Sequence, residues 1–157
     1  MPRVLAIDPG NYCGFALVDD GGLVLSGVWH LVGEKGEPTG RRFWRLFHRL
    51  AELADEGIPD VLAFETKFAL PGASTRNLLN TGGYIGTLQT WCVQHQLPEP
   101  TSIAPSSLKK RATGNGRAEK VDMAAWASHR SGRDIRDDNE ADAVCLAFVV
   151  HEELTRA

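Results

Sequence analysis

The chain has no long hydrophobic run, little cysteine and little net charge, and each of these absences excludes a class of protein. Its longest apolar run, Ala143 to Val150, is far shorter than the roughly 20 residues that a membrane-spanning helix needs, so no membrane association is expected. The three cysteines are odd in number, far apart and set in apolar surroundings, which predicts reduced thiols in the core of a cytoplasmic protein. The first expected strand follows Met1-Pro2-Arg3 directly, so we expect no signal peptide.

The sequence also lacks the motifs of zinc-binding and nucleotide-binding sites. The five histidines show no zinc-like spacing with each other or with cysteine. No glycine-rich turn is followed by Gly-Lys-Ser or Gly-Lys-Thr, so a nucleotide P-loop is not expected. A net charge of −3 argues against a protein that coats nucleic acid through overall basicity. The segment from Ile103 to Arg136 nevertheless carries eight Lys or Arg against three acids, so the positive charge is concentrated there.

The chain does contain three acidic residues at the ends of apolar runs. Asp8 follows the run 4–7 and precedes Pro9-Gly10, Glu65 ends the run 61–64, and Asp142 stands where a polar stretch gives way to a long apolar one. An unpaired carboxylate at the tip of a buried strand is costly, so it is retained where something binds it. Three such carboxylates form the donor set that a hard divalent cation needs. Taken singly, each acid also fits an ordinary solvated charge at the end of an element.

The order of the expected elements indicates an α/β fold in a single domain over residues 1–157. The expected strands are Val4–Asp8, Gly14–Val18, Leu23–Leu31, Val61–Glu65 and Thr101–Ala104, and the expected helices are Arg41–Glu56, Ser74–Gln96, Ala118–His129 and Asn139–Leu154. If the first and fourth strands are parallel neighbours, Asp8 lies beside Glu65 at the sheet edge where open α/β sheets bind ligands. This order matches the ribonuclease H-like fold, with a mixed five-stranded sheet flanked by helices.

Four motifs, in order along the chain, resemble those of the RuvC-type Holliday junction resolvases. They are Ile7-Asp8-Pro9-Gly10 with Gly14-Phe15-Ala16, Phe64-Glu65 with Phe68, Leu108-Lys109 with the basic segment Thr113 to Lys120, and Asn139-Glu140-Ala141-Asp142-Ala143. Any one motif alone would be weak evidence, but four in the right order are strong. The resemblance implies a homodimeric endonuclease, bacterial or phage-encoded, that cuts branched DNA with two Mg²⁺ ions per active site, for which Mn²⁺ substitutes.

The resemblance also implies a role for individual residues. Asp8, Glu65 and Asp142 would hold the ions, and Lys120 would be the cation nearest the scissile phosphate. Phe68 would stack on an unpaired base where the junction opens, although a loop-anchoring core phenylalanine is the alternative. The full set of implied DNA contacts is Lys67, Phe68, Arg76, Lys109, Lys110, Gly114, Gly116, Arg117 and Lys120.

The fourth ligand position departs from the family pattern. The family commonly places Asp or His three residues before the last Asp, and this chain has Asn139 there. Asp138 lies four residues before Asp142 and would share its helix face, so it is the predicted fourth ligand. Asn139 remains the alternative, because an amide oxygen also coordinates metals. Asp137 or Asp138 equally fits a helix N-cap.

Gly82, Gly83 and Gly86 stand inside the expected long helix, where each costs up to about 1 kcal/mol of helix propensity. Small residues permit a close approach, either to the sheet or to a second subunit. A homodimer suits a two-fold junction, since two symmetric nicks need two sites. The competing functions are cleavage of flaps, forks or other branched DNA, silent junction binding, and an actin-like ATP-dependent activity, which the missing second phosphate loop disfavours. No motif identifies a partner helicase.

Overall fold

The computed structural model describes residues 2–66 and 72–157. The strands and helices, in chain order, are β1 Val4–Asp8, β2 Tyr12–Asp19, β3 Gly22–His30, α1 Gly40–Ala54, β4 Val61–Glu65, α2 Thr75–Gln94, β5 Thr101–Ile103, α3 Pro105–Thr113, α4 Lys120–Ser131 and α5 Asp138–Arg156. All the elements expected from the sequence are present, and α3 is an addition to them. Pro105 begins α3, at a position where its fixed φ suits a helix and its missing N–H costs nothing.

The five strands form one mixed sheet in the order β3-β2-β1-β4-β5, which confirms the predicted sheet. β1 pairs antiparallel with β2 and parallel with β4, and β4 pairs parallel with β5. In the β1–β4 register Ile7 lies beside Phe64. The next residue on each strand is acidic, so the two carboxylates predicted to meet do end neighbouring strands at one edge.

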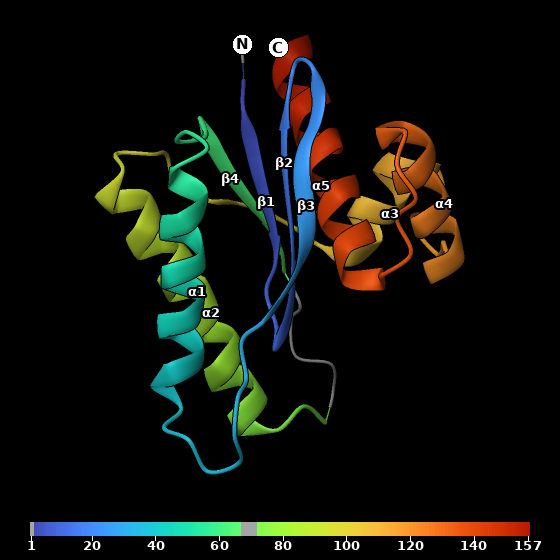
Figure 1. Ribbon diagram of the computed structural model, residues 1–157. Coiled ribbons are helices and arrows are strands. Elements are labelled where there is room, and N and C mark those ends of the chain that lie inside the picture. The colour runs from blue at the N-terminus through green and yellow to red at the C-terminus, as the bar shows by residue number, and fades with distance from the viewer. Residues whose placement is uncertain (1, 67–71) are drawn as a thin grey trace.

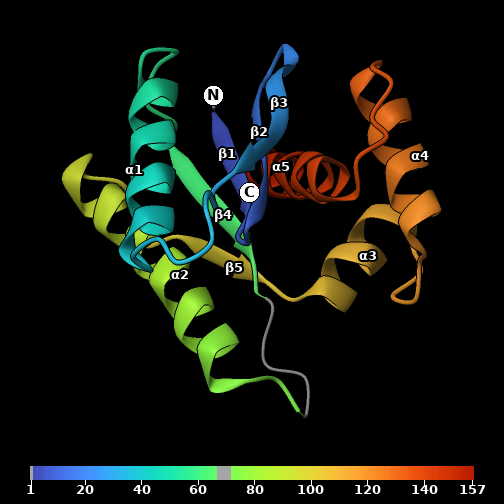
Figure 2. The same cartoon turned by 60° about the horizontal axis from the view of Figure 1, so that its bottom comes forward.

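Helices cover both faces of this sheet. Figures 1 and 2 show α1 and α2 on one side and α3, α4 and α5 on the other. Alternate strand residues supply the two cores, because successive side chains of a strand point to opposite faces. Leu5, Ile7 and Leu17 pack under α1 and α2, whereas Ala6 and Ala16 pack under α5.

The α5 helix is the most deeply buried helix and lies across β1 and β2. Its residues 143–151 are all buried, so the apolar run at the end of the chain is a core helix. None of the described helices combines the length and the apolar character that crossing a bilayer requires. All three cysteines are buried, and no disulfide joins them within the described residues.

Candidate active site

Asp8 and Glu65 stand at the C-terminal tips of β1 and β4. Both are buried, with 1% and 6% of their surface exposed. β1 ends here because Pro9-Gly10 follows Asp8. β4 ends at Glu65, and the backbone N–H of the next residue, Thr66, donates to the Ile103 carbonyl oxygen, 2.9 Å away. The sheet therefore delivers two acids to one place.

Gly14 brings the start of α5 against this edge. It is the β2 residue that pairs with Asp8, and a Cβ built on it would lie 1.9 Å from the carbonyl oxygen of Asn139. No side chain fits in that space, so only glycine allows the first turn of α5 to rest on β2. Asp142, one turn further along α5, is thereby brought toward the acidic strand tips.

A small pocket of about 110 Å³ unites four of the residues predicted from the sequence. Its lining consists of Glu65, Pro105, Leu108, Lys109, Lys120, Met123 and Asp142. Beneath it, burial and then the negative charges of Asp142 and Glu65 raise the pKa of the Cys145 thiol to about 12. The thiol stays neutral at physiological pH, and the acids of β4 and α5 act on one common region.

The two lysines of the pocket come from consecutive helices joined by a structured turn. Lys109 lies on α3, which ends at Gly114 with a positive φ of 83°, a conformation that favours glycine. Glu119 then caps α4 reciprocally with Asp122, so Lys120 is the first residue of that helix. The turn therefore returns the chain to the pocket and presents a second cation there.

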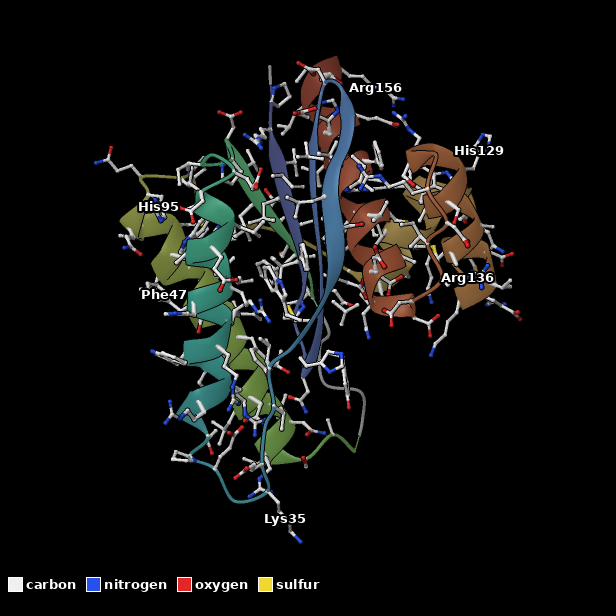
Figure 3. All side chains as sticks on the ribbon, viewed as in Figure 1. Lys35, Phe47, His95, His129, Arg136 and Arg156 are labelled. Atoms are coloured by element: carbon white, nitrogen blue, oxygen red, sulfur yellow. The ribbon has the colours of Figure 1, made fainter. Side chains whose placement is uncertain are left out.

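Asp137 and Asp138, at the start of α5, have different surroundings. Asp137 is the N-cap, since its Oδ1 accepts from the backbone N–H of Asn139 at 2.8 Å and of Glu140 at 3.0 Å. Asp138 Oδ2 lies 3.3 Å from Lys120 Nζ. Figure 3 shows Arg136, in the linker before α5, at the opposite end of α4 from His129. That is the end at which Lys120 begins α4, in agreement with the contact to Asp138.

Asp8, Glu65 and Asp142 offer oxygen donors at this edge, and Asp138 and Asn139 remain the two predicted candidates for a fourth. Hard divalent cations such as Mg²⁺ take oxygen ligands. Among residues 2–66 and 72–157, no three His, Cys, Asp or Glu side chains converge closely enough to hold one ion by themselves. Mg²⁺ is usually bound by one or two carboxylates with substrate phosphates and waters, so the donor set fits Mg²⁺ bound together with a phosphate group.

The other predicted DNA contacts lie outside this pocket. Lys110, Gly114 and Arg117 are exposed on the α3–α4 side. Arg76 lies on the α1–α2 side instead, in a groove of about 520 Å³ that Arg42 also lines. Arg42 is not among the predicted site residues. Its Nη1 lies 3.3 Å from Oδ1 of Asn11, which follows Asp8 by three residues. The residues Lys67 and Phe68 fall outside the described part of the chain.

The glycines of α2 differ from one another. A Cβ on Gly83 would lie 2.1 Å from the Phe43 ring, so Gly83 serves the close packing of α2 on α1, which is neither of the two contacts expected. Around Gly82 and Gly86 an added Cβ would meet nothing within 4 Å in the described chain.

A mixed sheet in this strand order, with acids at the tips of β1 and β4 and on α5, defines a ribonuclease H-like nuclease. The chain belongs to the RuvC family, because the model of the crossover junction endodeoxyribonuclease RuvC matches residues 4–151. It is 38% identical to the crossover junction endodeoxyribonuclease RuvC of Halorhodospira halophila, over 100% of this chain and 96% of the relative. That identity over nearly full length, together with the family match, identifies the chain as a DNA-cleaving hydrolase.

Solved structures support the fold. Thermus thermophilus RuvC in complex with a Holliday junction substrate superposes with a TM-score of 0.84 at 23% identity, over 99% of this chain and 96% of that one. The yeast mitochondrial Holliday junction resolvase Ydc2 superposes with a TM-score of 0.63 at 18% identity, over 99% and 81% of the two chains. The ribonuclease H-like fold predicted from the order of elements is confirmed.

Proposed function

We propose that this protein is a Mg²⁺-dependent endonuclease that resolves four-way DNA junctions by paired nicks near the crossover. The observation that carries the proposal is the pocket that joins Glu65 and Asp142 to Lys109 and Lys120, next to the strand that ends in Asp8. Carboxylates and cations side by side suit a phosphodiester, whose reaction needs metal ligands on one side and charge relief on the other.

The residues proposed to hold the cations are Asp8, Glu65 and Asp142, with Asp138 or Asn139 in the fourth position. Two bound Mg²⁺ ions, or Mn²⁺ in their place, would supply an activated water and relief of charge on the departing oxygen. The three acids come from three different elements, β1, β4 and α5, and burial of Asp8 and Glu65 fixes the orientation of their side chains. The backbone carbonyl of Asn139 packs against Gly14, and this contact keeps the start of α5 at this edge of the sheet.

Lys120 and Lys109 are proposed to act on the phosphate in different ways. Lys120 begins α4, where backbone N–H groups and the helix dipole also favour an anion. Lys109 lies on α3 across the pocket and is proposed to contact the backbone further from the scissile bond. A cation at the reacting phosphate stabilises charge that develops in the transition state, whereas a remote one only releases counterions.

Lys120→Ala is therefore expected to lower the single-turnover cleavage rate by about 100-fold, with a much smaller loss of affinity. Lys109→Ala is expected mainly to weaken binding and to reduce the slope of log affinity against log salt by about one. Rapid-quench kinetics and fluorescence anisotropy at several salt concentrations measure the two quantities. If both variants change rate and affinity equally, the division of roles is wrong.

Further DNA contacts are proposed on both sides of the pocket. Lys110, Gly114, Gly116 and Arg117 would meet the backbone on the α3–α4 side, and Arg76 on the α2 side, where its groove also offers Arg42. For Lys67 and Phe68 the proposal is a backbone contact and an aromatic wedge that stacks on an unpaired base. It rests on their place in the sequence just after Glu65.

We also propose that the protein works as a homodimer through α2. Leu79 and Val93 are 70% and 76% exposed, while the opposite face of α2 buries Tyr84, Leu88, Trp91 and Cys92. Gly82 and Gly86 lie between them at helical spacing, and the space around both is open within the described chain. An apolar stripe with two glycines suits a second α2 at close range, which would place two active sites on one junction.

Substrate choice is tested by cleavage of a panel with equal arm lengths: a four-way junction, a flap, a fork and a linear duplex. The four-way junction is expected to be cut at least about tenfold faster than the others. A flap or fork cut as fast or faster would establish the second candidate, a nuclease for branched DNA in general.

We place the activity in the cytoplasm, that of the bacterial host if the chain is phage-encoded, since buried reduced thiols suit that compartment.

A further inference from the structure

The ion pair between Asp138 and Lys120 connects the first residues of two helices. Asp138 Oδ2 and Lys120 Nζ are 3.3 Å apart, and the pair bridges the N-terminus of α5 to the N-terminus of α4. A lysine at the first position of a helix stands in the positive end of the helix dipole, which disfavours a cation. Lys120 is therefore placed where it needs a counterion.

Glu65 and Asp142 line the pocket together with Lys120, and the charged groups on the groove side of Lys120 have partners of their own. Glu119 and Asp122, in the same turn of α4, bind each other's backbone N–H groups in the capping box. Arg136, which lines the same surface groove as Lys120 and Asp138, pairs with Asp134 at 2.8 Å. Asp137 caps α5. Among the groups on this groove, Asp138 is the carboxylate that pairs with Lys120.

The geometry also separates Asp138 from Asn139. Neighbouring residues of an α-helix point about 100° apart. The backbone of Asn139 lies on Gly14, the strand partner of Asp8, whereas the carboxylate of Asp138 reaches α4. Of the two candidates for the fourth ligand, Asp138 has its carboxylate on the α4 side, whereas Asn139 lies in the part of the first turn that rests on β2.

We infer that Asp138 is a positioning residue for Lys120, an internal counterion that holds its ammonium group in the groove beside the pocket until a DNA phosphate takes the place of the carboxylate. This inference rests on the proposed function, because it assumes that Lys120 meets the phosphate that is cut. It assigns the fourth oxygen ligand to Asn139 instead of Asp138. The side chains of Lys120 and Asp138 are 81% and 48% exposed, so water already weakens their ion pair and a phosphate can readily replace the carboxylate.

The inference requires that Asp138 oppose binding while it assists cleavage. A carboxylate close to the phosphate position competes with it for Lys120, and the same carboxylate keeps the flexible lysine side chain from turning toward solvent. Asp138→Asn is therefore expected to bind a junction about two- to fivefold more tightly in EDTA and to cleave it several-fold more slowly at saturating DNA. A metal ligand would instead change the response to Mg²⁺.

The test uses the full chain with Asp138→Asn. The matched control is Asp134→Asn, which breaks the ion pair with Arg136 in the linker between α4 and α5 and removes no partner of Lys120. Junction affinity is measured by anisotropy in EDTA, the single-turnover rate at saturating junction, and the half-saturating Mg²⁺ concentration. Asp138→Asn should move affinity and rate in opposite directions and leave the Mg²⁺ half-saturation within twofold of wild type. Asp134→Asn should leave all three unchanged.

A double variant shows whether the effect passes through Lys120. In a Lys120→Ala background the gain in affinity from Asp138→Asn should vanish, because the cation for which carboxylate and phosphate compete is gone. The inference is overturned if the gain persists there, if Asp138→Asn changes neither affinity nor rate, or if it raises the half-saturating Mg²⁺ tenfold or more. Failure of the proposed function would look different, since the wild type would then neither cut nor prefer the junction.

Discussion

Asp142→Asn is expected to abolish cleavage of a four-way junction, with a loss of about a thousandfold or more in the single-turnover rate. The change keeps the shape of the side chain and removes the charge that would hold a cation at the pocket, which is worth several kcal/mol in the transition state. Because 1.4 kcal/mol is a factor of ten, a loss of about 4 kcal/mol reaches that range. The rate is measured at saturating Mg²⁺ and saturating junction.

Binding of the junction by Asp142→Asn is expected to equal or exceed that of the wild type. The variant removes a negative charge that faces phosphates and leaves the basic surface of α3 and α4 in place. Glu153→Gln is the matched control, an exposed acid on the same helix that pairs with Arg111 away from the pocket. Cleavage by Asp142→Asn within tenfold of wild type would remove Asp142 from the site.

Gly14→Ala has the second largest expected effect, and its cause is packing instead of charge. The new Cβ would lie 1.9 Å from the Asn139 carbonyl oxygen, a backbone atom, so β2 or the start of α5 must shift. Overpacking of this kind costs about 3 kcal/mol or more. For a chain of this size the melting temperature should fall by about 6–12 °C. Cleavage should also fall, because a shift of the first turn of α5 would move Asp142 away from Asp8 on β1.

The control for this experiment is Gly40→Ala at the start of α1, where an added Cβ meets nothing within 4 Å in the described chain. Its melting temperature should match or slightly exceed that of the wild type, since alanine favours a helix. Differential scanning calorimetry measures both variants. An unchanged melting temperature for Gly14→Ala would mean that α5 does not rest on β2 in solution as described.

The sequence alone predicts the sheet and its acidic edge well. Runs such as Val4 to Ile7 are apolar throughout and end at Asp8-Pro9-Gly10, so both the strand and its end can be read locally. Asp8 was expected beside Glu65 on the condition that β1 and β4 are parallel neighbours, and the sheet meets that condition. The helix α3 is missed because its residues Ser106 to Arg111 are mostly polar and show little apolar periodicity. Pro105 was the available signal for its start.

The surroundings of individual side chains depend on packing between elements distant in sequence. Asp137, Asp138 and Asn139 are similar polar residues in a row; the cap at Asp137 is local, but only the positions of α4 and β2 make Asp138 a counterion and Asn139 a backbone contact. The same holds for the glycines of α2, where Gly83 meets Phe43 of α1 and Gly82 faces outward. Local pattern gives no means of predicting such differences.

The most direct measurement is the mapping of nicks on a synthetic four-way junction, with each strand labelled in turn, in Mg²⁺ and in EDTA, for the wild type and Asp8→Asn. We expect two symmetric nicks in opposing strands near the crossover, made by the wild type in Mg²⁺ and absent in EDTA and with Asp8→Asn. Equal nicking by Asp8→Asn, nicking in EDTA, or no cleavage by the wild type in Mg²⁺ or Mn²⁺ would contradict a carboxylate-held metal site at the tips of β1 and β4.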